Sequence, residues 1–180
     1  MEPSRLEILD HGQHITFVFE DLLKYHGRSA IGGVAHGFKV MERALPLLAG
    51  GEPPERADIV IDSGFGGNGA RDAFEMVTRA VSGGRFRFDP DLAPDAPDSP
   101  IGRYFFRFTH RAGAAVDLIL RPGLISDEFV DLAKRGASSP EEEARLAWLK
   151  QDMADRLMGL PATDVYDARP AGGGPVTGER

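Results

Sequence analysis

Two histidines of this chain, His26 and His36, lie ten residues apart on either side of a glycine-rich turn. Imidazoles placed in this way can converge on a metal ion, and the carboxylate of Asp62 or Asp72 can complete a site of nitrogen and oxygen ligands. We therefore predict a metal site formed by His26, His36 and Asp62, for a divalent ion such as zinc, iron or nickel. The alternative for His36 is a polar residue at the start of a helix.

Proton transfer is a second chemistry open to His26, because a histidine side chain changes its charge near neutral pH. In this hypothesis His26 is the general acid or base, Asp72 orients it, and Arg28 or Lys39 stabilises negative charge. Both titratable groups have structural alternatives. A histidine at the C-terminal end of a helix and an aspartate in the first turn of a helix are each favoured by the helix dipole.

Cationic side chains indicate a site for an anion. The guanidinium of Arg28 can hold a carboxylate or a phosphate with two parallel hydrogen bonds, and Lys39 and Arg71 can add positive charge. We include the neighbouring Gly32 and Gly33 in this predicted ligand-binding set, because a ligand can approach the backbone closely at glycine. A solvated arginine on the surface is the alternative interpretation of Arg28.

A second glycine-rich segment carries the pattern G-x-G-x-x-G at Gly64, Gly66 and Gly69, and Asp89 follows twenty residues later. A strand is expected before this loop and a helix after it, so the segment formally satisfies the dinucleotide-binding fingerprint. Dinucleotide binding is the weaker hypothesis here, because two helices are expected before the first strand. We prefer an anion bound by the helix-start amides of Asn68–Ala70. A tight turn without any ligand is the structural alternative.

Apolar periodicity and turn residues predict the elements that must position these side chains. We expect helices over 17–25, from Val34 to about Leu48, from about residue 70 to the Gly83-Gly84 pair, from Ser126, and from Ser139 to Leu157. Strands are expected at 57–62, 85–88, 103–109 and 115–120, the last two as an antiparallel hairpin. The acidic, proline-rich stretch 89–100 is expected to be a loop.

These elements predict an α+β fold, in which a mixed sheet of about four or five strands packs against helices and a long helix lies near the C-terminus. We expect a single domain over residues 17–168. Residues 1–16 would form an N-terminal segment, and residues 169–180 a disordered tail.

Composition and charge exclude several classes of function. The chain has 180 residues, of which 42% are apolar, and it has no cysteine. Disulfides, thiolate metal sites and cysteine nucleophiles are therefore excluded. The net charge is −7 without a dense basic block, so we expect no binding of nucleic acid. No apolar stretch is long enough for a membrane span or a signal peptide, which predicts a cytoplasmic protein without membrane association.

Several motifs resemble those of the formylmethanofuran dehydrogenase E-like family. The run Phe19-Glu-Asp-Leu-Leu-Lys-Tyr-His26-Gly27 is similar to the family segment that leads into H-G-H-x-C-P-G, and Val34-Ala-His-Gly-Phe-Lys39 is similar to the helix that follows. Ile59-Val-Ile-Asp-Ser-Gly64 resembles the strand that ends in N-D-x-C-G, Asp72-Ala-Phe74 resembles D-A-I-Q, and Leu157–Tyr166 resembles the closing segment. These blocks occur in the family order and span most of the chain, but both family cysteines are missing.

The resemblance implies specific roles and a context. His26 occupies the position of the leading family histidine, Arg28 replaces the second one, and Asp72 matches the aspartate of D-A-I-Q. Relatives form homodimers, which implies a dimer here, with the apolar stripe of the 139–158 helix as a contributor. The resemblance also implies a connection with one-carbon metabolism and with pterin- or furan-linked cofactors.

Our leading hypothesis from sequence is a binding or accessory module, in which a cleft between 26–39 and 62–72 takes up a small anionic ligand. It does not require catalysis, because the redox centres of the dehydrogenase lie on other polypeptides of that complex. The rival hypothesis is a stand-alone enzyme that uses His26 or a His26 and His36 metal site. A structural dimer that has lost its site is the third.

Overall fold

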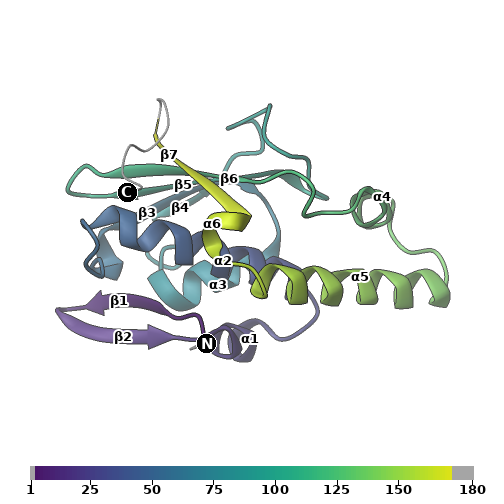
Figure 1. Ribbon diagram of the computed structural model, residues 1–180, viewed down its shortest axis with the longest axis horizontal. Coiled ribbons are helices and arrows are strands. Elements are labelled where there is room, and N and C mark those ends of the chain that lie inside the picture. Colours follow the sequence, from purple (N-terminus) through teal and green to yellow (C-terminus); the bar gives the residue numbers. More distant parts are fainter. Residues whose placement is uncertain (1–2, 172–180) are drawn as a thin grey trace.

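The computed structural model of this chain describes residues 3–171, whose helices and strands are arranged in three layers (Figure 1). A five-stranded sheet makes the first layer, helices α2 and α3 the second, and the β1–β2 hairpin with α1 the third. The helices are α1 (Phe19–His26), α2 (Ile31–Leu48), α3 (Asn68–Thr78), α4 (Asp127–Arg135), α5 (Pro140–Met158) and α6 (Ala162–Val165). The strands are β1 (Leu6–Asp10), β2 (Gln13–Phe17), β3 (Ile59–Phe65), β4 (Phe86–Phe88), β5 (Gly102–His110), β6 (Ala115–Leu120) and β7 (Tyr166–Pro170).

The large sheet has the strand order β4-β3-β5-β6-β7 and is mixed. Strands β3 and β4 are parallel, whereas β3 with β5, β5 with β6, and β6 with β7 are antiparallel. The predicted fold class is therefore confirmed, including the long helix near the C-terminus and the hairpin of β5 and β6. No helix within residues 3–171 has the length and apolar character needed to cross a lipid bilayer.

Strand alternation decides which side chains enter the core. On β5, the rings of Tyr104, Phe106 and Phe108 are buried beneath the sheet, on the side of the helices. The residues between them along β5 point to the other face of the sheet. There Arg107 forms a two-pronged ion pair with Asp117 on β6 at 2.6 and 2.9 Å. This opposite face carries the charged pair beside the buried ring of Phe105, and the helix-covered face carries the aromatic core.

Helices α2 and α3 pack closely because small residues line their contact. A Cβ atom added to Gly69 would lie 2.6 Å from the carbonyl oxygen of Ala30 and 2.8 Å from the amide nitrogen of Val34. Gly33 lies against Gly69, and Gly37 lies against α3 one turn further along. The contact thus advances in the same direction on both helices, so they run parallel with their N-termini side by side.

Some boundaries differ from those expected from sequence. Helix α2 begins at Ile31 rather than Val34, because its glycines pack against neighbouring helices instead of forming a separate turn. Residues 1–16 are predicted only as a terminal segment, yet β1 and β2 form a hairpin whose Leu6 and Ile8 side chains are buried. Arg169 and Pro170, predicted to begin a disordered tail, pair with β6. The rest of that predicted tail, 172–180, lies outside the described residues.

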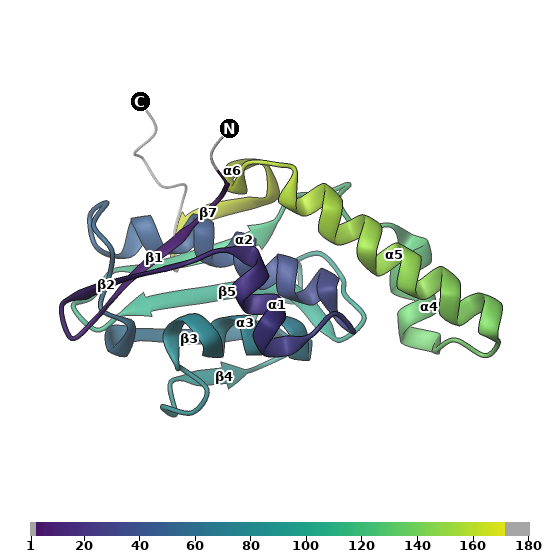
Figure 2. The same ribbon diagram turned by 90° about the horizontal axis from the view of Figure 1, so that it is seen from below.

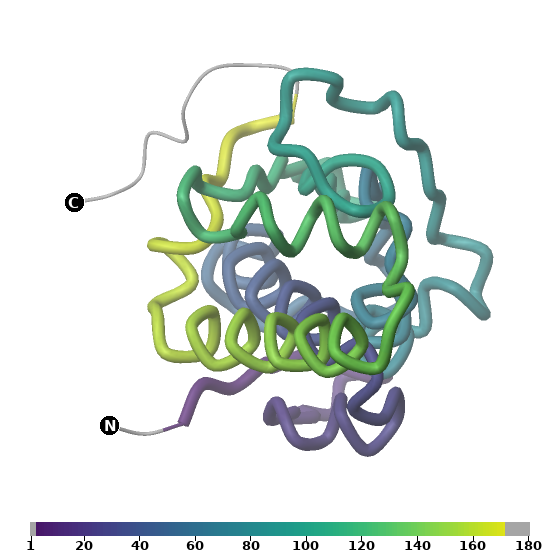
Figure 3. The backbone as a smooth tube through the Cα atoms, turned by 90° about the vertical axis from the view of Figure 1, so that its right-hand side faces the viewer, coloured from purple at the N-terminus to yellow at the C-terminus, as the bar shows by residue number. Residues whose placement is uncertain are grey.

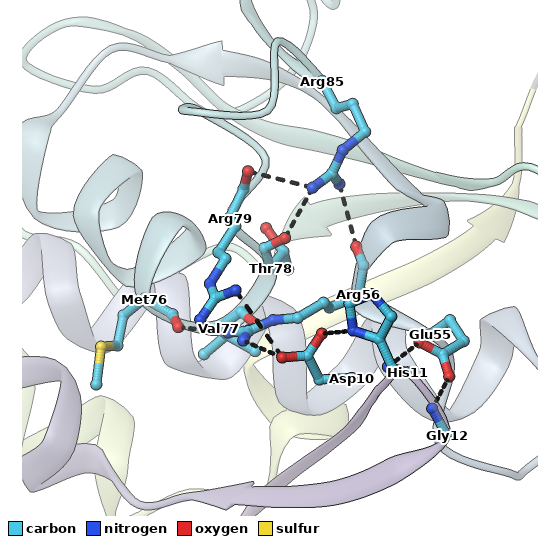
Figure 4. A network of polar contacts seen from close by, with 10 residues as sticks. All are labelled: Asp10, His11, Gly12, Glu55, Arg56, Met76, Val77, Thr78, Arg79 and Arg85. Atoms are coloured by element: carbon cyan, nitrogen blue, oxygen red, sulfur yellow. Dashed lines mark hydrogen bonds and ion pairs between the residues drawn. The ribbon is translucent and has the colours of Figure 1, made fainter.

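Two arginines from other elements stabilise the C-terminal end of α3 (Figure 4). The Arg56 side chain is 6% exposed and donates to the carbonyl oxygens of Val77 and Met76 at 2.7 to 3.0 Å. Arg85 donates to the carbonyl oxygens of Thr78 and Arg79 at 3.0 and 3.1 Å. The last carbonyl groups of a helix carry partial negative charge, so both guanidinium groups are favourably placed.

We predict that Arg56→Met lowers the free energy of unfolding by about 2–4 kcal/mol, because buried carbonyl groups of α3 lose their donors. Urea unfolding of the purified variant measures the change. The matched control is Arg79→Met, since Arg79 is 63% exposed and only 3.9 Å from Asp10, and it should cost about 0.5 kcal/mol or less. Equal losses in the two variants would contradict this role of Arg56.

Candidate functional site

His26 and Asp72, predicted to act together, are in direct contact. His26 is the last residue of α1, and Asp72 lies in the first half of α3. The Nδ1 atom of His26 lies 2.7 Å from Oδ2 of Asp72, and the histidine side chain is 9% exposed. Its Nε2 atom is buried and has no hydrogen-bond partner among the described residues. Because the carboxylate accepts the Nδ1 proton, Nε2 keeps the lone pair of the neutral ring.

The N-terminal ends of α2 and α3 lack the usual compensating groups. Neither helix has a side-chain cap or an acidic residue in its first turn. Helices α4 and α5 have both, because Ser126 and Ser139 accept hydrogen bonds from the first turns and acidic residues follow. Since α2 and α3 are parallel neighbours, their partial positive charges lie side by side, which favours an anion nearby.

A cleft opens beside the N-terminal end of α2, between the turn after α1 and helix α5. Its volume is about 330 Å³. Its lining consists of Arg28, Ser29, Ile31, Glu143, Leu146, Ala147, Lys150 and Gln151. We call it the Arg28–Lys150 cleft. Three further clefts, one between β1 and α2, one beside α4 and one beside α6, contain none of the residues predicted from sequence.

The two cations of this cleft come from different elements. Arg28 is 64% exposed and forms a surface ion pair with Glu20 at 3.3 Å, an interaction that contributes little to stability. Lys150 donates from Nζ to the carbonyl oxygen of Ser29 at 3.2 Å. Arg28 is among the ligand-binding residues predicted from sequence, whereas Lys150 is not. The position of Lys150 depends on the packing of α5 against Gly32 of α2, which no local sequence pattern encodes.

The predicted cleft between the two glycine turns is closed by helix packing. Gly33 contacts Gly69, and Gly32 faces the Met153 sulfur of α5, 3.0 Å from where a Cβ would lie. These glycines therefore serve close packing. Asn68 and Arg71 are exposed on the first turn of α3.

The dinucleotide fingerprint is matched in topology but its loop is covered. Strand β3, helix α3 and the parallel strand β4 follow one another, and Asp89 comes directly after β4. A Cβ on Gly66, however, would lie 2.7 Å from Ile101 and 2.8 Å from Phe88. Gly64 similarly packs against the backbone of β5. Apolar side chains thus occupy the space beside Gly66 where a phosphate would have to approach.

The structure does not bring the predicted metal ligands together. Asp62 points to the charged face of the sheet and accepts a hydrogen bond from Arg87 at 2.9 Å. His36 is buried among aromatic rings, where its Nδ1 lies 2.7 Å from the Tyr166 hydroxyl and its ring stacks on Tyr104. Among residues 3–171 no group of three or more histidine or carboxylate side chains is arranged to hold a metal ion. The site of His26, His36 and Asp62 is therefore not formed.

Lys39, predicted to stabilise negative charge in the site, has a structural role instead. Its side chain is fully buried, and Nζ lies 2.7 Å from the Glu42 carboxylate. It also donates to the carbonyl oxygen of Leu160 at 2.8 Å. This ammonium therefore ties the segment after α5 to α2. The sequence around Lys39 does not indicate its partner, the carbonyl oxygen of Leu160, which is 121 residues away.

Comparison of this chain with protein-family models and with curated proteins finds no match. The assignment of a function consequently depends on the geometry described above.

Burial among aromatic rings lowers the pKa of His36 from 6.5 to about 3. Between these values the unfolded chain binds a proton that the folded chain does not. The free energy of unfolding is therefore predicted to fall as the pH decreases below 6.5, by up to about 1.4 kcal/mol per pH unit from this residue. His36→Gln should remove this part of the slope between pH 7 and pH 5 in urea titrations.

The control is His14→Gln, because His14 is exposed on β2 and its replacement should leave the pH slope unchanged. An identical slope in His36→Gln and the unsubstituted protein would show that His36 does not titrate differently on folding.

Proposed function

We propose that this protein binds a small anionic molecule in the Arg28–Lys150 cleft. The observation that carries the proposal is the position of this cleft at an uncapped helix N-terminus, with one cation on each side. Backbone amides at the start of α2 and the two side chains supply donors of the kind that bind carboxylate and phosphate groups. The parallel neighbour α3 adds a second positive helix end nearby.

The arrangement of charges around α3 supports the same proposal. Its C-terminal carbonyl groups receive donors from Arg56 and Arg85, while its N-terminal end has no acidic counterpart in the first turn. The partial negative charge at the C-terminal end of α3 is thus compensated by arginines, whereas the partial positive charge at its N-terminal end has no acidic residue in the first turn. A bound anion near the paired helix starts would supply the missing negative charge.

The resemblance in motifs adds a metabolic context to the proposal. We propose, from those motifs alone, a binding or accessory module related to one-carbon metabolism. A homodimer is proposed on the same basis. It is supported by α4 and the N-terminal half of α5, which extend beyond the sheet in two perpendicular views (Figure 2). Trp148, on α5, is 54% exposed, and large exposed aromatic side chains are frequent at protein interfaces.

The contact between His26 and Asp72 favours a second candidate function, general acid or base catalysis. A carboxylate that accepts the Nδ1 proton orients the ring and leaves Nε2 free to take a proton from a substrate. His26 does not line the cleft and its Nε2 is buried, so in this alternative the turn after α1 has to move before a substrate reaches Nε2. Ligand binding alone does not require the ring proton of His26 to be on Nδ1.

Titration with acetate and with inorganic phosphate tests the binding proposal. We expect dissociation constants in about the millimolar range, because such small ligands offer few atoms for contact. Backbone amide signals of residues 28–31 and 147–151 should shift in NMR spectra. The Arg28→Gln, Lys150→Gln double variant should bind about ten-fold more weakly or worse, since charge-assisted hydrogen bonds are lost.

The control for that experiment is the Lys24→Gln, Arg169→Gln double variant, which removes the same charge from exposed positions outside the cleft. It should keep the affinity of the unsubstituted protein. If both double variants lost the same affinity, the loss would come from the change in net charge. That result would contradict a site at the cleft.

The tautomer of His26 tests the catalytic alternative. Nitrogen-detected NMR at pH 8 should find the proton of the neutral ring on Nδ1, and Asp72→Ala should shift it toward Nε2, which is the preferred position in free histidine. An unsubstituted protein with the ring proton on Nε2 would exclude His26 as the base.

A further inference from the structure

We infer that the cleft between β1 and α2 is a second binding site, and that its ligand is a small primary alkylammonium ion. This cleft shares no residue with the Arg28–Lys150 cleft, and we call it the Pro46 cleft. Three features carry the inference, namely a proline inside a helix, a buried apolar floor, and a rim with more carboxylates than cations.

Pro46 leaves a backbone acceptor of α2 without its usual donor. A helix carbonyl group normally accepts from the amide four residues later, but proline has no N–H, so the carbonyl of Glu42 receives no such bond. Glu42 and Pro46 are one helical turn apart, and both line the Pro46 cleft. The gap in the helical hydrogen bonds is therefore at the wall of the cleft. Proline inside a helix costs stability, and such departures from sequence rules concentrate at functional sites.

The floor of the cleft is apolar and buried. Strand β1 passes across the C-terminal half of α2 (Figure 2). Leu6 of β1 and Met41 and Leu45 of α2 line the cleft there, and each is at most 2% exposed. The volume is about 160 Å³, and a protein cavity of about 150 Å³ is large enough for benzene. The cleft thus fits a hydrocarbon chain of about three to five carbons, which these side chains would shield from water.

Carboxylates outnumber cations around this floor. Glu7, Glu42 and Glu52 line the cleft together with Arg5. Glu42 also pairs with Lys39 at 2.7 Å. When that buried ammonium group is counted, three carboxylates face two cations, which leaves a net charge of −1. Glu7 and Glu52 are exposed and have no ion-pair partner among residues 3–171.

A primary ammonium group matches these features. It carries one positive charge and three N–H donors, so it can contact a rim carboxylate and the Glu42 carbonyl oxygen together while its alkyl chain covers the floor. A carboxylate or phosphate would meet net negative charge. A neutral hydrocarbon would leave the backbone acceptor unpaired. Free amines and the side chain of lysine share the required chemistry.

A neighbouring cleft shares Glu42 and Pro46 but lacks this combination. It lies between α2 and residues 158–163, has a volume of about 460 Å³ and has Ser4 in its lining. Figure 3 shows the N-terminal segment, in purple, entering the fold below the yellow-green end of α5. Within this lining Arg43 balances Glu42, the one carboxylate present. The ligand therefore fits the Pro46 cleft better.

The experiment is a titration of the intact chain with n-butylammonium, followed by calorimetry and amide NMR shifts. We expect a dissociation constant in about the millimolar range, with shifts at residues 5–7, 41–45 and 51–53. Butyrate, 1-butanol and butyltrimethylammonium, which has the charge but no N–H donor, should each bind about ten-fold more weakly or worse. Equal affinity for acetyl-lysinamide would assign the site to a lysine side chain, and exclusion of acetyl-lysinamide would assign it to a free amine.

Pro46→Ala tests the backbone acceptor. The alanine amide can donate to the Glu42 carbonyl oxygen, so this variant should raise the melting temperature by about 2–8 °C. It should also bind n-butylammonium about five-fold more weakly or worse, because the acceptor is then occupied. The matched control is Pro53→Ala, which removes a ring from the same lining outside the helix and should keep the affinity within about two-fold.

The rim is tested by the Glu7→Gln, Glu52→Gln double variant, which should bind n-butylammonium about five-fold more weakly or worse. Its control is the Asp95→Asn, Glu141→Gln double variant, which removes the same charge from exposed positions outside the cleft and should keep the affinity. The inference is overturned if n-butylammonium does not bind, if both double variants weaken equally, or if Pro46→Ala binds as tightly as the unsubstituted protein. None of these changes touches the Arg28–Lys150 cleft, so anion binding there is decided separately.

Discussion

The close parallel contact of α2 and α3 is the constraint on which the rest of the structure depends. Glycine at positions 33, 37 and 69 lets the two backbones approach without intervening side chains. This contact places both helix starts at the same end of the domain. It also brings Asp72 of α3 within reach of His26 at the end of α1. A larger residue in the contact would separate the two helices and, with them, the pair of titratable groups.

The electrostatics of this arrangement are asymmetric. Parallel helix dipoles repel each other modestly, and the effect is concentrated at their ends. At the C-terminal end of α3 the chain compensates with two arginines drawn from the segments before β3 and before β4. Near the N-terminal ends of α2 and α3 the chain places cationic groups together with partner carboxylates, since Asp72 contacts His26 and Glu20 pairs with Arg28. The proposed anion site therefore depends on the uncapped backbone amides of α2 more than on an excess of positive side chains.

Sequence reasoning succeeded where the determinants are local. The serines at 126 and 139 begin helices, as their capping side chains predict, and Gly27 ends α1. At the start of α5 the Ser139 hydroxyl accepts from the amide of Glu142, while the Glu142 carboxylate accepts from the amide of Ser138 rather than that of Ser139. Pairing of His26 with Asp72 was also predicted, although by analogy with known motifs.

Prediction failed where distant packing decides. The alternation of β3 sends Asp62 to the charged face of the sheet, and the aromatic core encloses His36, so neither reaches His26. The glycines interpreted as ligand contacts instead provide close packing between helices, a use that composition alone does not distinguish from backbone exposure. Lys150 was missed because its partner, the Ser29 carbonyl, lies 121 residues away. Strand β7 pairs with the distant β6, and the locally paired N-terminal hairpin buries Leu6 and Ile8 in the core that the rest of the fold supplies.

The hydrogen bond from Lys150 to Ser29 has a mechanical consequence. An ammonium group has three donors, and this one uses a single donor to hold the turn after α1 against the middle of α5. The two remaining donors keep the orientation that this bond imposes. If the cleft binds an anion as proposed, occupation of the cleft and the position of α4 and α5 are therefore coupled, and by reciprocity each stabilises the other.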